Sequence, residues 1–331
     1  MKFLKSALLL GTALFTMSGQ AFAERTMRMT VQVGANHPIG ANTHFFAEEL
    51  NRISGGEMTV EVYDSAQLFK GQEVPQAISS GAIDLGIALA DEYAGSIPAA
   101  GIFSVAFLFP DYETLAKAAD REGEFRQIFD EMILSAGSRV LWWQDYGPVQ
   151  MLSKDTPVAM PTDMSGKMVR AMGKPTGDLI EAAGGSAVVI GGSEQFVAYQ
   201  RGVVDIGMSG TTAIKSRALY EVMDQVTMTN HGLAEFIAVI NPALWDDLSD
   251  QEKQWMTEAA IAAEEKMRTG TESENVEAAK WLVDEGHATV TELTEEQLAA
   301  WKEATQPAVD RFREESGEQG ASLLSALDAL E

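Results

Sequence analysis

The chain has 331 residues, of which 24 are Lys or Arg and 49 are Asp or Glu, so its formal net charge is −25. This acidic balance argues against nucleic-acid binding, which needs clustered basic side chains, and against a lasting seat on an anionic membrane surface. The absence of Cys excludes disulfides, thiolate metal sites and Cys nucleophiles, while 46% hydrophobic residues are ample for a folded core.

The N-terminus has the pattern of a secretory signal. Lys2 and Lys5 precede a short apolar stretch, residues 7–15, and Ala21-Phe22-Ala23 supplies a small-x-small cleavage site. We therefore expect cleavage after Ala23; a buried N-terminal helix is the alternative. The mature chain would carry 22 basic and 49 acidic residues, a charge of −27. No later apolar run reaches the roughly 18 residues of a membrane span, so we expect a periplasmic protein that is not membrane-embedded.

The first part of the mature chain alternates between strand and helix patterns. Alternating apolar residues indicate strands, a one-sided apolar face indicates a helix, and a short apolar run after Gly81 indicates a buried strand. This order is typical of a parallel sheet covered by helices. The predicted elements are strands at 27–33, 58–62 and 82–87, and helices at 43–53 and 73–80.

The same alternation returns later in the chain. Residues 80–87 and 201–208 match as a helix end, a Gly suited to positive φ, and an apolar strand interrupted by Asp. Two corresponding copies favour two α/β lobes with related topology, with a ligand cleft between them. The predicted elements here are strands at 167–172, 186–190 and 203–208, and helices at 176–183 and 193–200.

The last third of the chain is predicted to be helical. Ser249 with Glu252, and Thr294 with Gln297, form capping boxes. Amphipathic stretches rich in Ala, Glu and Lys follow these caps, and no flexible linker separates the two halves. We therefore expect lobes that share crossing strands and helices. The helical stretches are residues 254–266, 272–284 and 295–315.

Sequence motifs for catalysis are absent. The four His residues lack metal-site spacing, and no nucleophile elbow, dinucleotide fingerprint or phosphate-binding loop is present. The neighbouring acids Asp91 and Glu92 could do acid–base work, but such pairs arise by chance among 49 acids. We expect a protein that is not an enzyme and needs no cofactor or metal.

A cation in an apolar strand is the more informative feature. Arg170 lies in Lys167-Met168-Val169-Arg170-Ala171-Met172, and an Arg at a strand end suits a carboxylate because its planar fork makes two parallel bonds. A surface ion pair is the alternative. The aromatic cluster of Trp142, Trp143 and Tyr146 could line a pocket or fill the core, and the pattern favours the core.

From about Met29 to Leu323 the sequence resembles the solute-binding proteins of tripartite ATP-independent periplasmic (TRAP) transporters, the DctP-like family. The order and spacing of several segments carry this resemblance, although no single segment is specific. They are His37-Pro38, Gly81 to Leu85, Phe103 to Phe109 followed by Asp111-Tyr112-Glu113, Pro161 to Arg170, Ser193-Glu194, Gly202 to Asp205, Leu219 to Val222, and Thr229-Asn230-His231.

The resemblance implies a two-lobed α/β fold of the periplasmic-binding-protein kind, type II-like, with a long domain-spanning helix and a helical C-terminal tail. Lobe I would comprise residues 24–147 plus 236–275, and lobe II residues 148–235 plus 276–331 with the C-terminal helices. The family captures small organic acids in the cleft and delivers them to a sodium-driven permease with a small and a large membrane subunit. A binding protein of an ATP-driven importer, or a ligand-binding subunit for a sensor kinase, is the alternative.

The resemblance places Arg170 on the Arg that grips the ligand carboxylate. Gln150 lies where sialic-acid-binding relatives have a second Arg, and Ser209 replaces an Asn, so a monocarboxylate is favoured over a dicarboxylate. Gln150, Ser209 and Trp143 are expected to add hydrogen bonds and an apolar wall. Four further pocket positions depart from the family pattern: Leu89, Glu92, Gly173 and Gly192. Glu92 could face a ligand amine or point outward.

Overall fold

The computed structural model describes residues 24–330, and the predicted signal peptide, residues 1–23, lies outside them. Its largest sheet has five strands in the order β2-β1-β3-β10-β4. Strand β1 is parallel to β2 and β3, whereas β10 is antiparallel to β3 and β4. The strands are β1 (Arg25–Thr30), β2 (Met58–Tyr63), β3 (Leu85–Leu89), β4 (Arg139–Pro148) and β10 (Leu233–Ile240).

Helices and short 3-10 turns cover this first sheet. Helix α1 begins at Pro38, earlier than predicted, because the His37 ring accepts a hydrogen bond from the Ile39 backbone N–H at 3.1 Å and Pro38 needs no donor partner. The other elements are η1 (Gly71–Glu73), α2 (Val74–Ser79), η2 (Ala90–Tyr93), η3 (Pro98–Ser104), α3 (Tyr112–Ala118), α4 (Glu124–Ser135) and α8 (Pro242–Asp247), and α1 itself spans Pro38–Ile53.

The second half of the fold contains a four-stranded sheet, β11-β9-β5-β8, and a two-stranded sheet, β6-β7. The backbone N–H of Arg170 donates to the Ile206 carbonyl at 2.9 Å, which ties β6 to the segment leading into β8. The strands are β5 (Gln150–Ser153), β6 (Met168–Ala171), β7 (Ser186–Val189), β8 (Gly207–Ser209), β9 (Gln225–Met228) and β11 (Thr289–Glu292). The helices are η4 (Pro161–Met164), α5 (Lys174–Ala182), η5 (Gly192–Glu194), α6 (Gln195–Gln200), α7 (Thr211–Ser216) and η6 (Leu219–Glu221).

The two matching segments form the same turn in both halves. Gly81 and Gly202 have φ angles of 73° and 66°, so the predicted positive φ is confirmed at both positions. The strands that follow start later than predicted, at Leu85 and Gly207. The polar Asp84 and Asp205 side chains instead accept backbone hydrogen bonds from Arg28 and Met168 on the neighbouring strands.

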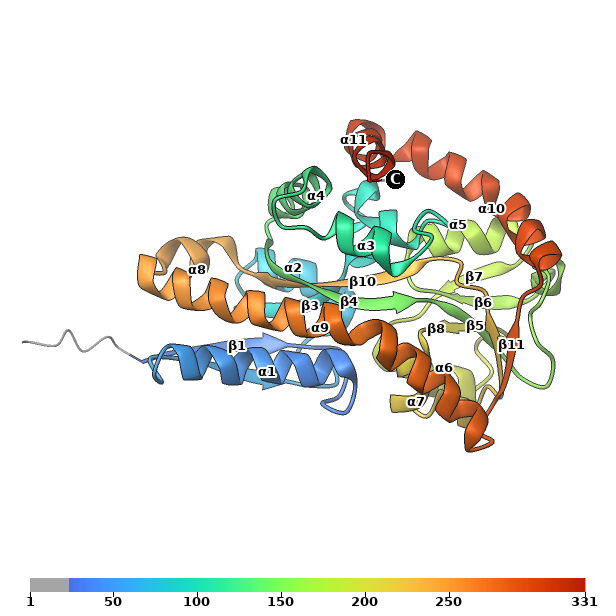
Figure 1. Ribbon diagram of the computed structural model, residues 1–331, viewed down its shortest axis with the longest axis horizontal. Helices are drawn as coiled ribbons and strands as arrows, with labels where there is room; N and C mark the ends of the chain where they lie inside the picture. Colours follow the sequence, from blue (N-terminus) through green and yellow to red (C-terminus); the bar gives the residue numbers. More distant parts are fainter. Residues whose placement is uncertain (1–23, 331) are drawn as a thin grey trace, which may run out of the picture.

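A single long helix joins the two halves. Helix α9 (Asp250–Asp284) has 35 residues and runs without a break through the two stretches predicted separately. Gly270 lies inside the helix and lowers its stability only modestly, because glycine has a low helix propensity but still allows the helical conformation. No Pro interrupts the helix. Figure 1 shows α9 passing from α1 and β4 toward α7 and β11, which are also its packing partners.

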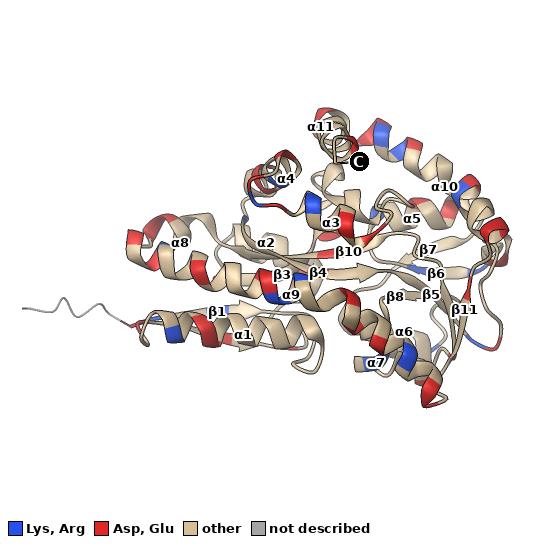
Figure 2. Cartoon of the chain, in the orientation of Figure 1, with Lys and Arg blue, Asp and Glu red and all other residues tan. Residues whose placement is uncertain are grey.

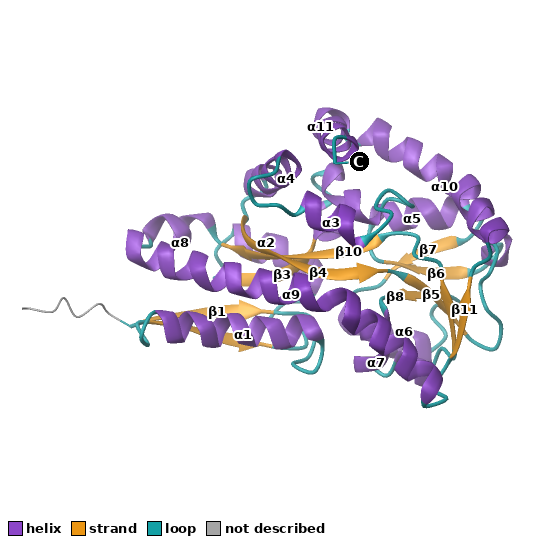
Figure 3. Cartoon of the chain, in the orientation of Figure 1, coloured by secondary structure: helices purple, strands orange, loops and turns teal. Residues whose placement is uncertain are grey.

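The C-terminal helices return across the molecule. Helix α10 (Glu295–Glu315) packs on α5, and α11 (Gly317–Asp328) packs on α4 and η3. Figure 3 shows the helices lying outside the strands on both sides of the fold. Figure 2 shows acidic residues distributed along helices α8, α9 and α10. Within residues 24–330, no helix is both long enough and apolar enough to cross a membrane.

Candidate functional site

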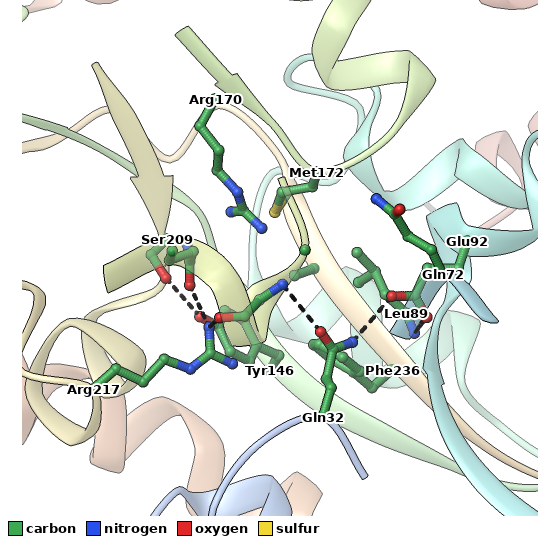
Figure 4. Close-up of a pocket in the computed structure, with 14 residues that line it drawn as sticks. Gln32, Gln72, Leu89, Glu92, Tyr146, Arg170, Met172, Ser209, Arg217 and Phe236 are labelled. Atoms are coloured by element: carbon green, nitrogen blue, oxygen red, sulfur yellow. Dashed lines mark hydrogen bonds between the residues drawn. The ribbon is translucent and has the colours of Figure 1, made fainter. Parts of the chain in front are cut away.

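A pocket lies where segments of the two halves meet (Figure 4). Its cavity volume is about 30 Å³, so the two halves lie close together around a narrow space in this structure. The first sheet and its loops contribute Gln32, Gln72, Leu89, Glu92, Tyr146, Ala234 and Phe236. The second half contributes Arg170, Met172, Gly191, Gly192, Gln195, Ser209 and Arg217.

Arg170 extends from β6 into this pocket, and its residue is only 5% exposed. Its Nε donates to the Ile190 carbonyl at 3.0 Å and its Nη1 donates to the Met208 carbonyl at 2.6 Å. Its Nη2 donates to no described residue. No Asp or Glu oxygen of residues 24–330 lies within the 4.0 Å ion-pair distance of Arg170, so this rigidly held cation has no protein carboxylate in direct contact.

Ser209 and Tyr146 form a polar corner beside this cation. Ser209 ends β8 and is 2% exposed, and its hydroxyl lies 3.2 Å from the Tyr146 hydroxyl on β4. The same Tyr146 oxygen accepts a 2.9 Å hydrogen bond from the Gly210 N–H. A Cβ at Gly210 would lie 2.3 Å from the Tyr146 ring, so glycine is what lets the strands approach here. Phe236 packs against Tyr146 with ring centroids 5.6 Å apart and supplies apolar surface.

Glu92 lies on the opposite side of the pocket and faces it (Figure 4). Its carboxyl accepts hydrogen bonds from the Leu89 N–H at 2.8 Å and the Gln32 amide at 3.1 Å. Burial raises the pKa of Glu92 to about 8, although these hydrogen bonds and Arg170 oppose the shift. Glu92 is therefore mainly an uncharged acid near neutral pH, which weakens the idea that it pairs with a ligand amine.

Arg217 is a second pocket cation that the sequence analysis did not identify. It follows α7, and its Nη1 donates to the Gly192 carbonyl at 2.9 Å and to the Gln195 side-chain oxygen. In the sequence it stands in Lys215-Ser216-Arg217, which has the ordinary pattern of basic residues near a helix C-terminus. Only the turn after α7 directs this side chain into the pocket, so no sequence signal distinguished it.

Two of the four predicted ligand-binding residues do not line the pocket. Gln150 is paired with Ser209 across β5 and β8, but its amide is engaged by Asn230 through hydrogen bonds of 2.7 and 3.1 Å. Trp143 is fully buried among Phe103, Phe125 and Phe129, and its ring N–H donates to Asp130 at 2.9 Å. Trp143 therefore fills the core, as the sequence pattern favoured for this aromatic cluster. Tyr146, from the same cluster, lines the pocket.

The pocket has the chemistry of an anion-binding site. Two guanidinium groups, a serine hydroxyl and a tyrosine hydroxyl converge on it, and its acid is largely uncharged. In residues 24–330, no group of three or more His, Asp or Glu side chains is arranged to hold a metal ion. The arrangement can bind and orient a carboxylate by charge-assisted hydrogen bonds.

Comparison with known proteins gives one family over most of the chain. A family model described as bacterial extracellular solute-binding protein, family 7 (DctP), matches residues 29–315. The C4-dicarboxylate-binding periplasmic protein DctP of Rhodobacter capsulatus is 28% identical over 327 residues, covering 98% of this chain and 97% of that protein.

Solved structures of similar fold cover almost the whole chain. A TRAP periplasmic solute-binding protein from Sulfurospirillum deleyianum with bound succinate matches with a TM-score of 0.85 and 25% identity, covering 93% of this chain and all of that one. The sugar acid binding protein DctPAm from Advenella mimigardefordensis, in complex with galactonate, matches with a TM-score of 0.88 and 22% identity, covering 94% and 100%.

Proposed function

Because this chain belongs to family 7 of the bacterial extracellular solute-binding proteins, the DctP family of TRAP transport receptors, we propose that it captures a small organic acid between its two lobes and delivers it to a sodium-driven permease. The family consists of periplasmic transport receptors rather than enzymes. Succinate and galactonate, both small acids, occupy the two solved relatives described above.

The observation that carries this proposal is the unpaired cation of Arg170. Two backbone carbonyls fix the guanidinium, Nη2 remains free of described partners, and the residue is 5% exposed. A buried charge is costly without a partner, and a ligand carboxylate would supply both the opposite charge and the hydrogen-bond acceptors. Ser209 and Tyr146 stand beside it as further hydrogen-bond groups.

Closure of the lobes would strengthen this ion pair. Excluding water lowers the local dielectric, so the attraction between guanidinium and carboxylate grows as the pocket closes. Closure is favoured by the ligand only through contacts that improve in the closed state. Arg170 on one side and Glu92 with Gln32 on the other are the groups that could make such contacts.

The sequence favours a monocarboxylate because Gln150 stands where sialic-acid-binding relatives have a second Arg. Arg217 supplies a second pocket cation from another segment, which removes the premise of that preference. The proposal here is therefore limited to a small acid held by one carboxylate at Arg170.

We also propose that lobe I comprises residues 24–147 plus 236–275 and that lobe II comprises residues 148–235 plus 276–331. The first five-stranded sheet is built mainly from the first set of residues and the remaining sheets from the second, which supports the division. Signal cleavage after Ala23, and the small and large permease subunits as partners, are proposals supported by the family match.

A thermal-shift screen of small carboxylic acids on the mature protein tests the capture of an acid. We expect the cognate acid at 100 times its dissociation constant to add about 2.7 kcal/mol to the free energy of unfolding. Mass spectrometry of co-purified ligand should identify the same acid. A screen in which amines or neutral sugars stabilise the protein and no acid does would contradict the proposal.

Delivery is tested separately, by uptake into vesicles that contain the permease. We expect uptake of the cognate acid to require both this protein and a sodium gradient. Uptake that depends on ATP instead would favour the importer alternative.

A further inference from the structure

Arg217 and Arg170 enter the same pocket from different segments of the chain. Arg170 comes from β6, whereas Arg217 comes from the turn after α7, and Figure 4 shows both side chains extending toward the space between them. Of the Arg217 donors, only Nη1 makes hydrogen bonds to described residues, so Nε and Nη2 remain available.

Arg217 is held in place by a built network. The fully buried Gln195 donates its amide N–H to the Met208 carbonyl at 2.9 Å, which orients the amide oxygen toward Arg217. The same Met208 carbonyl accepts a 2.6 Å hydrogen bond from Arg170. One backbone carbonyl and one glutamine side chain therefore link the two guanidinium groups and set their relative position.

Gly192 makes room for this arrangement. A Cβ at this position would lie 2.7 Å from the Gln32 side-chain oxygen and 3.1 Å from each terminal nitrogen of Arg217. Gly192 is one of the pocket positions at which this sequence departs from the family pattern. The guanidinium of Arg217 and the amide of Gln32 occupy the space beside it.

The pocket has more positive charge than the protein neutralises. No carboxylate of residues 24–330 lies within 4.0 Å of either guanidinium. The nearby acids offset this charge only in part: burial raises the pKa of Glu92 to about 8, so it is mainly uncharged near neutral pH, and that of Asp91 to about 7, so it is about half ionised. Burial also lowers the pKa of Arg217, and the positive charge of Arg170 adds to this effect. A single carboxylate would neutralise only one of the two cations.

We propose that Arg217 is a second ligand anchor that selects acids with two anionic groups, one bound at each guanidinium. This inference rests on the proposed function, because it assumes that an acid occupies the pocket. It goes beyond that function by naming a specificity-determining residue and the charge of the ligand. A ligand of the same shape with one charge fewer leaves one of the two guanidinium groups without a ligand counter-ion and binds more weakly.

The test compares each diacid with its monoamide, because the two differ by one charge and hardly in shape. Isothermal titration of the mature protein with succinate, succinamate, glutarate and glutaramate supplies two such pairs. We expect the better-fitting diacid to bind wild-type protein about 10-fold or more tightly than its monoamide, as charge-assisted hydrogen bonds require. Equal affinities, or tighter binding of the monoamide, would overturn the second anchor.

Variants at Arg217 assign the preference to that side chain. Arg217→Gln should reduce the preference for the diacid to about threefold or less, and should leave monoamide affinity within about threefold of wild type. Arg217→Lys retains the charge and should retain part of the preference, and it remains informative if Arg217→Gln does not fold. The exposed Arg201→Gln is the matched control and should change neither affinity.

The outcomes separate the two proposals. Monoacid and diacid binding that depends on Arg170 but not on Arg217 contradicts only the second anchor. Absence of binding by wild-type protein to both members of each pair, and to every acid in the screen above, contradicts the proposed function itself. Loss of diacid preference in Arg217→Gln, with monoamide binding retained, supports both.

Discussion

Single side chains give this pocket its charge. Arg170 was identified from its place in an apolar strand and from the family resemblance, and it does line the pocket. Arg217 was missed because its neighbourhood in the sequence is polar and helical, and only the turn after α7 brings it inward. Gln150, which was expected at the pocket wall, does not line the pocket here, and the sequence does not reveal that Asn230 engages its amide. Strand membership was predictable, whereas the direction of polar side chains at strand and helix ends was not.

The protonation of Glu92 should make the stability of the protein depend on pH. Its pKa is raised to about 8 in the folded protein, against an ordinary value of 4.5. Between about pH 4.5 and pH 8 the folded state therefore holds a proton that the unfolded chain has lost. The free energy of unfolding falls as the pH rises through this range. Glu92→Gln keeps an uncharged side chain at all pH values. We expect its free energy of unfolding to fall less than that of wild type between pH 6 and pH 9, measured by urea denaturation.

Ligand binding should show the same dependence. Ionisation of Glu92 above pH 8 places a negative charge in a pocket that attracts anions, so wild-type affinity for an acid should fall, while Glu92→Gln should bind with little change. The exposed Glu314→Gln is the control and should behave as wild type. A wild-type affinity that stays constant from pH 6 to pH 9 would contradict an uncharged Glu92.

Among the helices and strands, the alternation of the two was predictable, because apolar residues recur with the spacing that places them on the buried face of each element. The matching turns at Gly81 and Gly202 were also predictable, since helix ends require positive φ there. The sequence pattern did not predict that α9 continues through Gly270, because glycine often ends a helix. Tertiary packing of α9 outweighs the low helix propensity of this residue. The core position of Trp143 depends on contacts with η3 and α4, which lie far away in the sequence.

The N-terminus of α9 gives a prediction about this element. Ser249 accepts a hydrogen bond from the Glu252 N–H at 3.3 Å, and the Glu252 carboxyl accepts one from the Ser249 N–H at 2.8 Å. Ser249→Ala should lower the free energy of unfolding by about 0.5–2 kcal/mol, because the first turn loses its cap. Ser273→Ala, at an exposed interior position of the same helix, should cost less than about 0.5 kcal/mol. Equal costs in chemical denaturation would argue that the cap is not what stabilises this helix.

On the scale of the whole molecule, a few polar contacts bridge the two halves around the pocket. The Gln32 amide oxygen accepts a 3.2 Å hydrogen bond from the Gly192 N–H while its nitrogen donates to Glu92. Lys70 pairs with Glu194 at 2.7 Å, and the Asn36 amide donates to the Ser216 carbonyl at 3.1 Å. Such contacts favour the closed arrangement when they form only in that state.

These bridging contacts should differ in their effect on affinity. Gln32→Ala removes a partly buried hydrogen bond between the halves, so we expect ligand affinity to fall about fivefold, as one hydrogen bond of roughly 1 kcal/mol implies. Lys70→Ala removes an exposed ion pair and should change affinity by less than about threefold, with the difference vanishing at high salt. The measurement is isothermal titration at two salt concentrations. A larger loss of affinity in Lys70→Ala than in Gln32→Ala would contradict this expectation and show that the exposed ion pair matters more than the Gln32 hydrogen bond.

In the proposed binding mode, the buried guanidinium of Arg170 holds a ligand carboxylate between the lobes. Isothermal titration of the cognate acid into wild-type protein and the Arg170→Gln variant tests this role of Arg170. With folding verified by circular dichroism, the variant should bind on the order of 100-fold more weakly or not at all, because a desolvated carboxylate loses its counter-ion. An affinity within threefold of wild type would contradict the assignment of Arg170 as the anchor.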